Sequence, residues 1–168
     1  MRRLALTSLL LLLMTTSLIA PSAAQSSGNP IQQGTARVKV GTPLFFLGPG
    51  PGCLFRVDFG LTSTAGQPVG FGRQCVQSQT PTPCPTFCDV VVGHLTLSLA
   101  GGKLEADWTI SETFSPDFTT VTQTLAGTVT GGTGLYDDAA GTLSGGGLII
   151  FNPDGTLTTD LEIVLTLT

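Results

Sequence analysis

The sequence predicts an all-β domain, an antiparallel barrel of about eight strands. Three observations support this class. Apolar and polar residues alternate with a period of two through most of the chain, turns of glycine, proline and asparagine separate these segments, and no segment after the N-terminus shows helical spacing between a start and a stop signal. Short antiparallel connections favour a closed barrel, which removes exposed strand edges. A two-sheet β-sandwich is the alternative architecture.

The N-terminus has the organisation of a signal peptide. Met1–Arg3 is positively charged, residues 4–20 are mostly apolar, and the small residues Ser22–Ala24 offer a cleavage site after Ala24. Hydroxyl residues interrupt the apolar run, which makes it marginal for a membrane span of about 20 residues. We therefore expect a signal peptide at residues 1–24, a flexible leader at residues 25–34, and a single β-barrel domain at residues 35–168, secreted or periplasmic.

The predicted mature chain is acidic. Arg2 and Arg3 leave with the signal peptide, so five of the seven basic residues remain against eleven acidic ones, a net charge of about −6. Nucleic acids and anionic membrane surfaces require clustered lysine and arginine, so we expect neither as a partner. Charged residues are only 11% of the chain, while threonine, serine and glycine are abundant, which indicates a neutral, hydroxyl-rich surface.

A membrane-spanning barrel is disfavoured by composition. Such barrels carry apolar outer bands with aromatic girdles at both interfaces. This chain has one tryptophan, one tyrosine and four cysteines, and it ends in Thr168 rather than in an aromatic residue. We therefore expect no membrane span after signal removal.

The four cysteines are Cys53, Cys75, Cys84 and Cys88, an even number in an exported chain, which predicts disulfides. Cys84–Cys88 also has the spacing of a metal-ligand loop, but a zinc site needs the other two cysteines to converge on it, and an oxidising compartment disfavours thiolates. The four cysteines allow three different pairings. Cys53–Cys75 with Cys84–Cys88 is favoured, because a hairpin centred near Ala65 places the first two almost opposite each other.

In the first half of the domain, the alternation predicts strands at residues 35–40, 44–47, 53–61, 69–76 and 89–99. Gly48–Gly52 is expected to be a loop, because proline cannot donate a ladder hydrogen bond and glycine loses the most backbone entropy on ordering. Residues 62–68 turn the chain. Gln77–Phe87, rich in proline and threonine, is expected to be a loop closed by cysteines.

The second half begins with a hairpin signal at Ala100–Lys103. The next strand is expected to point Leu104, Ala106, Trp108 and Ile110 inward, and Glu105, Asp107, Thr109 and Ser111 outward. Turns at Ser115–Asp117 and Asn152–Gly155 separate the later strands. These are predicted at residues 120–129, 141–151 and 157–167.

A glycine-rich turn with the only tyrosine joins two late strands. Its sequence, Val129-Thr-Gly-Gly-Thr-Gly-Leu-Tyr-Asp-Asp-Ala-Ala-Gly141, followed by a glycine-rich strand, resembles the "GGTG-x-aromatic-x-x-A-x-G" turn of the allene oxide cyclase-like and dirigent-like barrels. The resemblance covers Thr119–Leu167, about a third of the mature chain. It implies an eight-stranded antiparallel barrel in which this turn links two late strands, and it implies homodimers. The cysteine-bearing half matches no family.

Two motifs resemble nucleotide-binding and calcium-binding sequences but lack the structural features that such binding requires. Thr130–Gly134 resembles a nucleotide-binding turn, but that function needs a following helix to present free amides to phosphate, and a strand follows here. Asp137 and Asp138 carry oxygens that suit Ca²⁺, but a single glycine-rich copy cannot stack into a calcium-binding coil. We predict ordinary turn residues here, with no cofactor and no metal.

No catalytic set can be assembled from the sequence. His94, the only histidine, points to the surface by parity with its leucine neighbours. Glu105, Asp107 and Glu112 are the candidates for a glycosidase carboxylate pair. The first two point outward by parity with Trp108, so we predict no catalytic residues.

Three residues are candidates for ligand contact. Gln123 lies on an otherwise apolar inward face, and a buried amide needs a hydrogen-bond partner from the backbone or from a bound molecule. Tyr136 is expected to fold over one end of the barrel, as a plug in preference to an aromatic lip for a ligand. Trp108 is expected in the core, with a stacking platform as the alternative.

These observations favour an exported, disulfide-linked barrel without catalytic activity, which binds a hydrophobic small molecule or another surface. The resemblance implies an alternative, an isomerase-like or cyclase-like enzyme that acts on a hydrophobic small molecule inside the barrel. Fold alone is weak support for that activity. An extracellular structural component is the third hypothesis. An interior cavity with a polar group favours the ligand and enzyme hypotheses, whereas a filled barrel excludes the enzyme.

Overall fold

Eight antiparallel strands form the described part of the protein. The computed structural model describes residues 33–168, without the side chains of Thr42 and Pro43, so the predicted signal peptide at residues 1–24 and most of the predicted leader lie outside it. The strands are β1 (Gly34–Leu47), β2 (Phe55–Ser63), β3 (Pro68–Thr82), β4 (Phe87–Leu99), β5 (Gly102–Phe114), β6 (Thr120–Gly134), β7 (Gly141–Phe151) and β8 (Leu157–Leu167).

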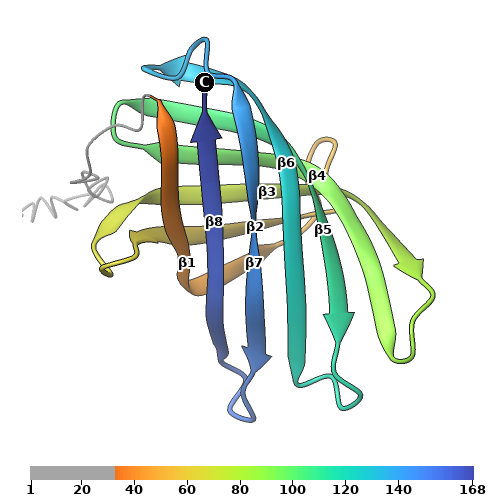
Figure 1. Ribbon diagram of the computed structural model, residues 1–168. Helices are drawn as coiled ribbons and strands as arrows, with labels where there is room; N and C mark the ends of the chain where they lie inside the picture. The colour runs from red at the N-terminus through yellow and green to blue at the C-terminus, as the bar shows by residue number, and fades with distance from the viewer. Residues whose placement is uncertain (1–32) are drawn as a thin grey trace, which may run out of the picture.

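The strands close into a barrel, as predicted. Each strand pairs with the next along the chain, and β8 pairs with β1 through a register that runs from Gly34 opposite Leu167 to Val40 opposite Leu161. Figure 1 shows the strands as one continuous curved wall. Because every strand has two neighbours, no edge is left unpaired. The sandwich alternative is thereby excluded.

The connections divide between two ends of the barrel. The β2–β3, β4–β5 and β6–β7 connections lie at one end, which we call the closed end. The β1–β2, β3–β4, β5–β6 and β7–β8 connections lie at the other, which we call the open end. In Figure 1 the β6–β7 loop is at the top, and the β5–β6 and β7–β8 hairpins are at the bottom.

Two strands differ from the prediction because of irregular register. The segments predicted separately at residues 35–40 and 44–47 form one strand, β1, whose pairing with β2 shifts between Gly41 and Leu44. The predicted loop Gln77–Phe87 is wrong for residues 77–82, which extend β3. A shift between Val76 and Ser78 interrupts the alternation there, so the continuing strand does not show the period of two.

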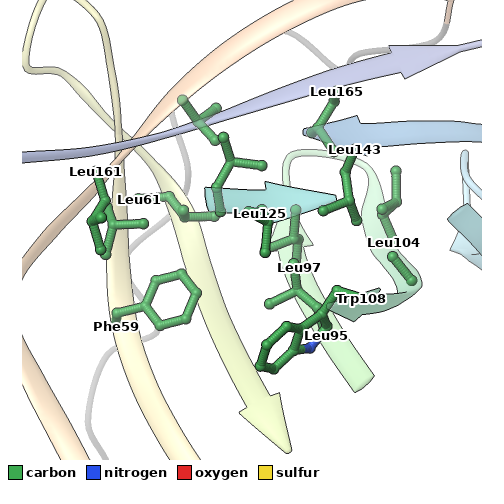
Figure 2. Close-up of a cluster of buried hydrophobic side chains, with 14 of the residues drawn as sticks. Phe59, Leu61, Leu95, Leu97, Leu104, Trp108, Leu125, Leu143, Leu161 and Leu165 are labelled. Atoms are coloured by element: carbon green, nitrogen blue, oxygen red, sulfur yellow. The ribbon is translucent and has the colours of Figure 1, made fainter. Parts of the chain in front are cut away.

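The core fills the closed half of the barrel. Leu97, Leu104 and Leu165 have no exposed surface, and Leu143 is 1% exposed. Figure 2 shows these leucines pointing toward one another from β4, β5, β7 and β8. Tyr136, in the β6–β7 loop, is 1% exposed, and its hydroxyl donates a hydrogen bond to the Ala100 carbonyl in the β4–β5 turn at 3.1 Å. The tyrosine therefore closes this end.

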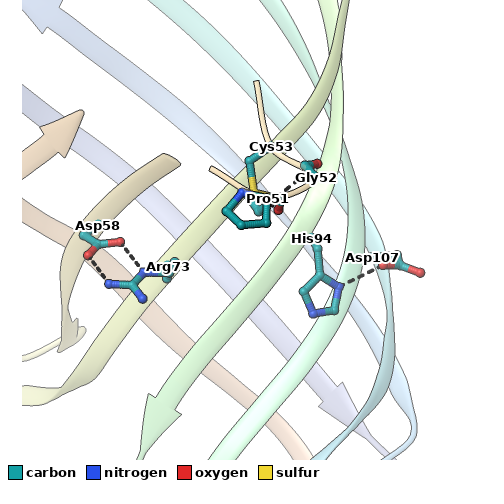
Figure 3. The surroundings of a disulfide bond; sticks show 8 residues. Pro51, Gly52, Cys53, Asp58, Arg73, His94 and Asp107 are labelled. Carbon is teal, nitrogen blue, oxygen red and sulfur yellow. Dashed lines mark hydrogen bonds and ion pairs between the residues drawn. A yellow bond between two sulfur atoms is a disulfide. The ribbon is translucent and has the colours of Figure 1, made fainter. Parts of the chain in front are cut away.

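Both favoured disulfides are present. Cys53, in the β1–β2 loop, is bonded to Cys75 on β3 across a Cα separation of 5.3 Å, and Cys84 is bonded to Cys88 across 6.0 Å. Figure 3 shows Cys53 beside Pro51 and Gly52 on the outer surface. No cysteine is free. The disulfides are consistent with an oxidising compartment outside the cytoplasm. Within residues 33–168, no helix has the length and apolar character to cross a membrane.

Candidate ligand cavity

The open half of the barrel contains a cavity of about 240 Å³. Apolar side chains that point into the barrel form most of its wall, among them Phe55, Phe59, Val91, Trp108 and Leu125. Phe46 and Phe151 also line it and are 58% and 40% exposed, so the cavity reaches the protein surface. An engineered apolar cavity of about 150 Å³ is large enough to hold benzene. This cavity therefore has room for a ring with a short side chain.

Four polar side chains form a row across neighbouring strands in this half. Gln79 on β3 donates through Nε2 to Asp89 Oδ2 on β4, and Gln123 on β6 donates through Nε2 to Glu112 Oε1 on β5. Asp89 and Glu112 are directly opposed in the β4–β5 ladder, as are Glu112 and Gln123 in the β5–β6 ladder. Gln79, Glu112 and Gln123 line the cavity, and Asp89 lies behind them at 1% exposure.

The two carboxyl groups of this row cannot both carry charge at low cost. Burial raises the pKa of Glu112 to about 7, with a hydrogen bond to Asp89 and the negative charge of Asp89 acting in the same direction, whereas the hydrogen bond from Gln123 lowers it. Opposed like charges are unfavourable, and one shared proton removes the repulsion. The Asp89–Glu112 pair therefore holds a proton below about pH 7.

Two buried polar atoms beside the cavity have no conventional partner among the described residues. Asp89 Oδ1 is one and the indole Nε1 of Trp108 is the other. The proton on Glu112 supplies a donor for Asp89. The Trp108 N–H has no acceptor among the protein atoms of residues 33–168, in a residue that lines the cavity, and an unsatisfied buried donor costs about 1–3 kcal/mol. A water or a ligand in the cavity would supply that acceptor.

A cluster of three phenylalanine rings lies at the rim of the cavity. Phe114, which lines the cavity, lies 5.1 Å from Phe87 and 5.9 Å from Phe118 between ring centroids. Phe87 and Phe118 are 38% and 58% exposed. Their rings come from the β3–β4 and β5–β6 sides of the open end, so a molecule that enters the cavity passes apolar surface.

The three ligand-contact candidates predicted from the sequence do not all lie at the cavity. Gln123 and Trp108 both line the cavity, from β6 and β5. Tyr136 does not line it and is buried at the closed end, so its placement supports the plug rather than a lip for this cavity.

Sequence reasoning missed the polar row. The sequence offers Glu112 only as one of three candidates for a glycosidase carboxylate pair, and it does not single out Asp89. Parity would have found both residues, because Asp89 shares a face with Leu95 and Glu112 shares one with Trp108. Parity could not have found Gln79, because the irregularity after Val76 moves it to the inward face.

The outward residues lie where the sequence placed them. His94 Nδ1 is 3.0 Å from an Asp107 oxygen, and His94 Nε2 is 3.7 Å from Glu105, all three on the outer surface (Figure 3 shows the pair with Asp107). Asp137 and Asp138 are exposed in the β6–β7 loop. Within residues 33–168, no group of three or more histidine, cysteine, aspartate or glutamate side chains is arranged to hold a metal ion.

Fold and cavity together define a closed antiparallel β-barrel with an interior space of ligand size. No protein-family model, curated protein or solved structure matches the chain. The resemblance to allene oxide cyclase-like and dirigent-like barrels therefore stays a prediction from the glycine-rich turn.

Proposed function

We propose that the protein is an exported binding protein for a small, largely apolar molecule that carries a polar group. The observation on which this rests is the cavity of about 240 Å³, with apolar walls and a short row of hydrogen-bonded polar side chains on one side. Ligand sites commonly combine these two features, since apolar walls provide affinity and a few polar groups fix orientation.

The energetic balance of the barrel supports this proposal. An unfilled apolar cavity forfeits dispersion contacts, and a buried donor without an acceptor adds a further cost. In the closed half of the same barrel the inward leucines are fully buried against one another. A bound molecule would restore contacts to the walls and offer an acceptor to Trp108 Nε1.

A second candidate function, acid–base catalysis on an apolar substrate, is favoured by one observation. The pKa of Glu112 is about 7, and a general acid or base works best when its pKa is near the working pH. Incubating the protein with whatever molecule co-purifies with it, followed by mass spectrometry, separates the two functions. A binding protein returns the molecule unchanged, whereas an enzyme returns a product.

The binding proposal can be tested with a neutral probe, 2-phenylethanol. The single tryptophan gives one indole N–H resonance, so titration by NMR reports directly on Trp108. We expect saturable shifts of this resonance in the native protein. The matched variants are Val91→Phe, which fills the cavity from β4, and Val92→Phe, which adds the same ring on the outer face of β4.

The pair of variants decides the outcome. Val92→Phe is expected to bind as the native protein does, and Val91→Phe is expected to lose binding, because its ring occupies the space. Equal binding by both variants, or no saturable shift in the native protein, contradicts the proposal.

A further inference from the structure

The charged groups of the barrel interior have one sign. Asp89 and Glu112 are the acids of the polar row, and within residues 33–168 no lysine, arginine or histidine lines the cavity. The basic side chains with ion pairs lie on the outer surface, where Arg37 pairs with Glu162, Lys39 with Asp160 at 3.3 Å and Arg73 with Asp58 at 2.7 Å.

The strand register and one hydrogen bond identify the polar groups that face the acid pair. Asp89 faces Glu112 from β4, Gln123 faces it from β6, and Gln79 reaches Asp89 from β3. Glu162 contributes to the cavity lining from β8, but its carboxylate is engaged by Arg37 outside the barrel. The charge of the acid pair is therefore compensated from within the barrel only by a proton.

We propose that the cavity selects a small apolar amine, whose ammonium group replaces the shared proton between Asp89 and Glu112 while its apolar body occupies the cavity. This inference rests on the proposed binding function and names the class of ligand. An ammonium group has three donors and a positive charge, so it can satisfy Asp89 Oδ1 and an oxygen of Glu112 together. A carboxylate ligand meets repulsion here, and a neutral alcohol gains no charge pairing.

The proton balance of binding follows from this arrangement. The amine enters as its ammonium form, Glu112 gives its proton to solvent, and the carboxylate pair then holds the ammonium, so one proton is released for each amine bound below about pH 7. Affinity for the amine should therefore rise with pH while Glu112 titrates and level off above its pKa. A neutral ligand that leaves the pair protonated shows no such rise.

Probes of similar shape isolate the effect of charge. 2-Phenylethylamine, 2-phenylethanol and 3-phenylpropanoate share a ring and a short chain, and a ring fits a cavity of about 240 Å³. We expect affinity for the amine, measured by calorimetry, to increase about twentyfold between about pH 5.5 and about pH 7.5. Affinity for the alcohol should change by less than about twofold, and the carboxylate should bind most weakly. Calorimetry in two buffers of different ionisation enthalpy measures the released proton.

Glu112→Gln provides the decisive variant. Glutamine has the shape of the protonated glutamate, so the variant resembles the state that the protein already adopts at acid pH. We expect it to bind the amine at least about tenfold more weakly at about pH 7.5 and without pH dependence, and to bind the alcohol as before. The matched control is Glu105→Gln, which removes an acid from the outer face of the same strand and should behave as the native protein does.

The outcomes separate the inference from the function beneath it. Alcohol binding that equals or exceeds amine binding at every pH overturns the amine inference and leaves the binding function standing. Loss of amine selectivity in Glu105→Gln also overturns it, because the amine would then be held by the outer surface. If none of the three probes binds, both fail.

Discussion

In the closed half of the barrel the inward side chains meet at the axis, whereas in the open half they leave a cavity. The closed half places leucines at facing positions of β4, β5, β7 and β8 and adds the Tyr136 ring from a loop. In the open half the ring from a loop, Phe118, stays at the rim and is 58% exposed, and Gln79, Glu112 and Gln123 are among the residues that line the space inside. Barrels of about eight strands are just wide enough to be filled by side chains or to hold one small ligand. This barrel is filled by side chains at one end and has a cavity of about 240 Å³ at the other.

The two halves are also held by different means. Packing and the Tyr136 hydrogen bond secure the closed end, while both disulfides lie in or next to loops of the open end. A cavity forfeits contacts that would otherwise stabilise its walls, and a covalent link limits the freedom of the unfolded chain instead. The closed end is therefore held by side-chain packing, and the end with the cavity by covalent links.

The largest expected effect contrasts core truncations in the two halves. Leu165→Ala in the closed half should lower the free energy of unfolding by about 2–5 kcal/mol, because it leaves a cavity among fully buried side chains. Phe46→Ala at the rim should cost less than about 1 kcal/mol, since that ring is 58% exposed. Urea unfolding of both variants measures the difference, and equal losses would remove the distinction between the halves.

A second effect depends on pH and belongs to the open half alone. The pKa of Glu112 rises from 4.5 to about 7 on folding, so between these values the folded state binds more protons than the unfolded state. The contribution of Glu112 to stability is then full below about pH 4.5 and is lost as the pH rises through about 7. Glu112→Gln should remove this decrease and Glu105→Gln should retain it in urea unfolding across pH. An unchanged slope in Glu112→Gln would show that other groups cause it.

The next largest expected effect is the loss of stability when a disulfide is removed. Cys53 and Cys75 are 22 residues apart and Cys84 and Cys88 only 4, so loop-closure entropy predicts a larger loss for the first pair. Replacing each pair with serine should cost about 3 and about 2 kcal/mol respectively, measured by thermal unfolding under oxidising conditions. A larger loss from the second pair would mean that the β3–β4 connection depends on its disulfide for more than chain entropy.

The smallest effect tests the plug. Tyr136→Phe keeps the ring and removes the hydrogen bond to the Ala100 carbonyl, which should cost about 1 kcal/mol of stability. Binding of 2-phenylethanol should be unaffected, because Tyr136 is not part of the cavity wall. Weaker binding in this variant would show that the closed end shapes the cavity after all.

Much of this fold was legible in the sequence because a strand with one face buried repeats every two residues. The alternation and the turn signals predicted the strands, and parity placed Trp108 and Gln123 inward. The same alternation, followed for a few more residues, also predicts that Asp89 and Glu112 point inward. It fails where register shifts, as it does after Val76, because pairing with β4 rather than local pattern decides which way Gln79 points.

By itself the sequence determined the all-β class, the favoured disulfide pairs and the tyrosine turn, because these depend on local period, spacing and turn chemistry. Only the tertiary structure decided that the barrel is filled at one end and hollow at the other, and that four polar side chains from four strands form one row. Such features depend on which residues meet across the barrel and across the ladders, and that is set by register and closure rather than by any single segment.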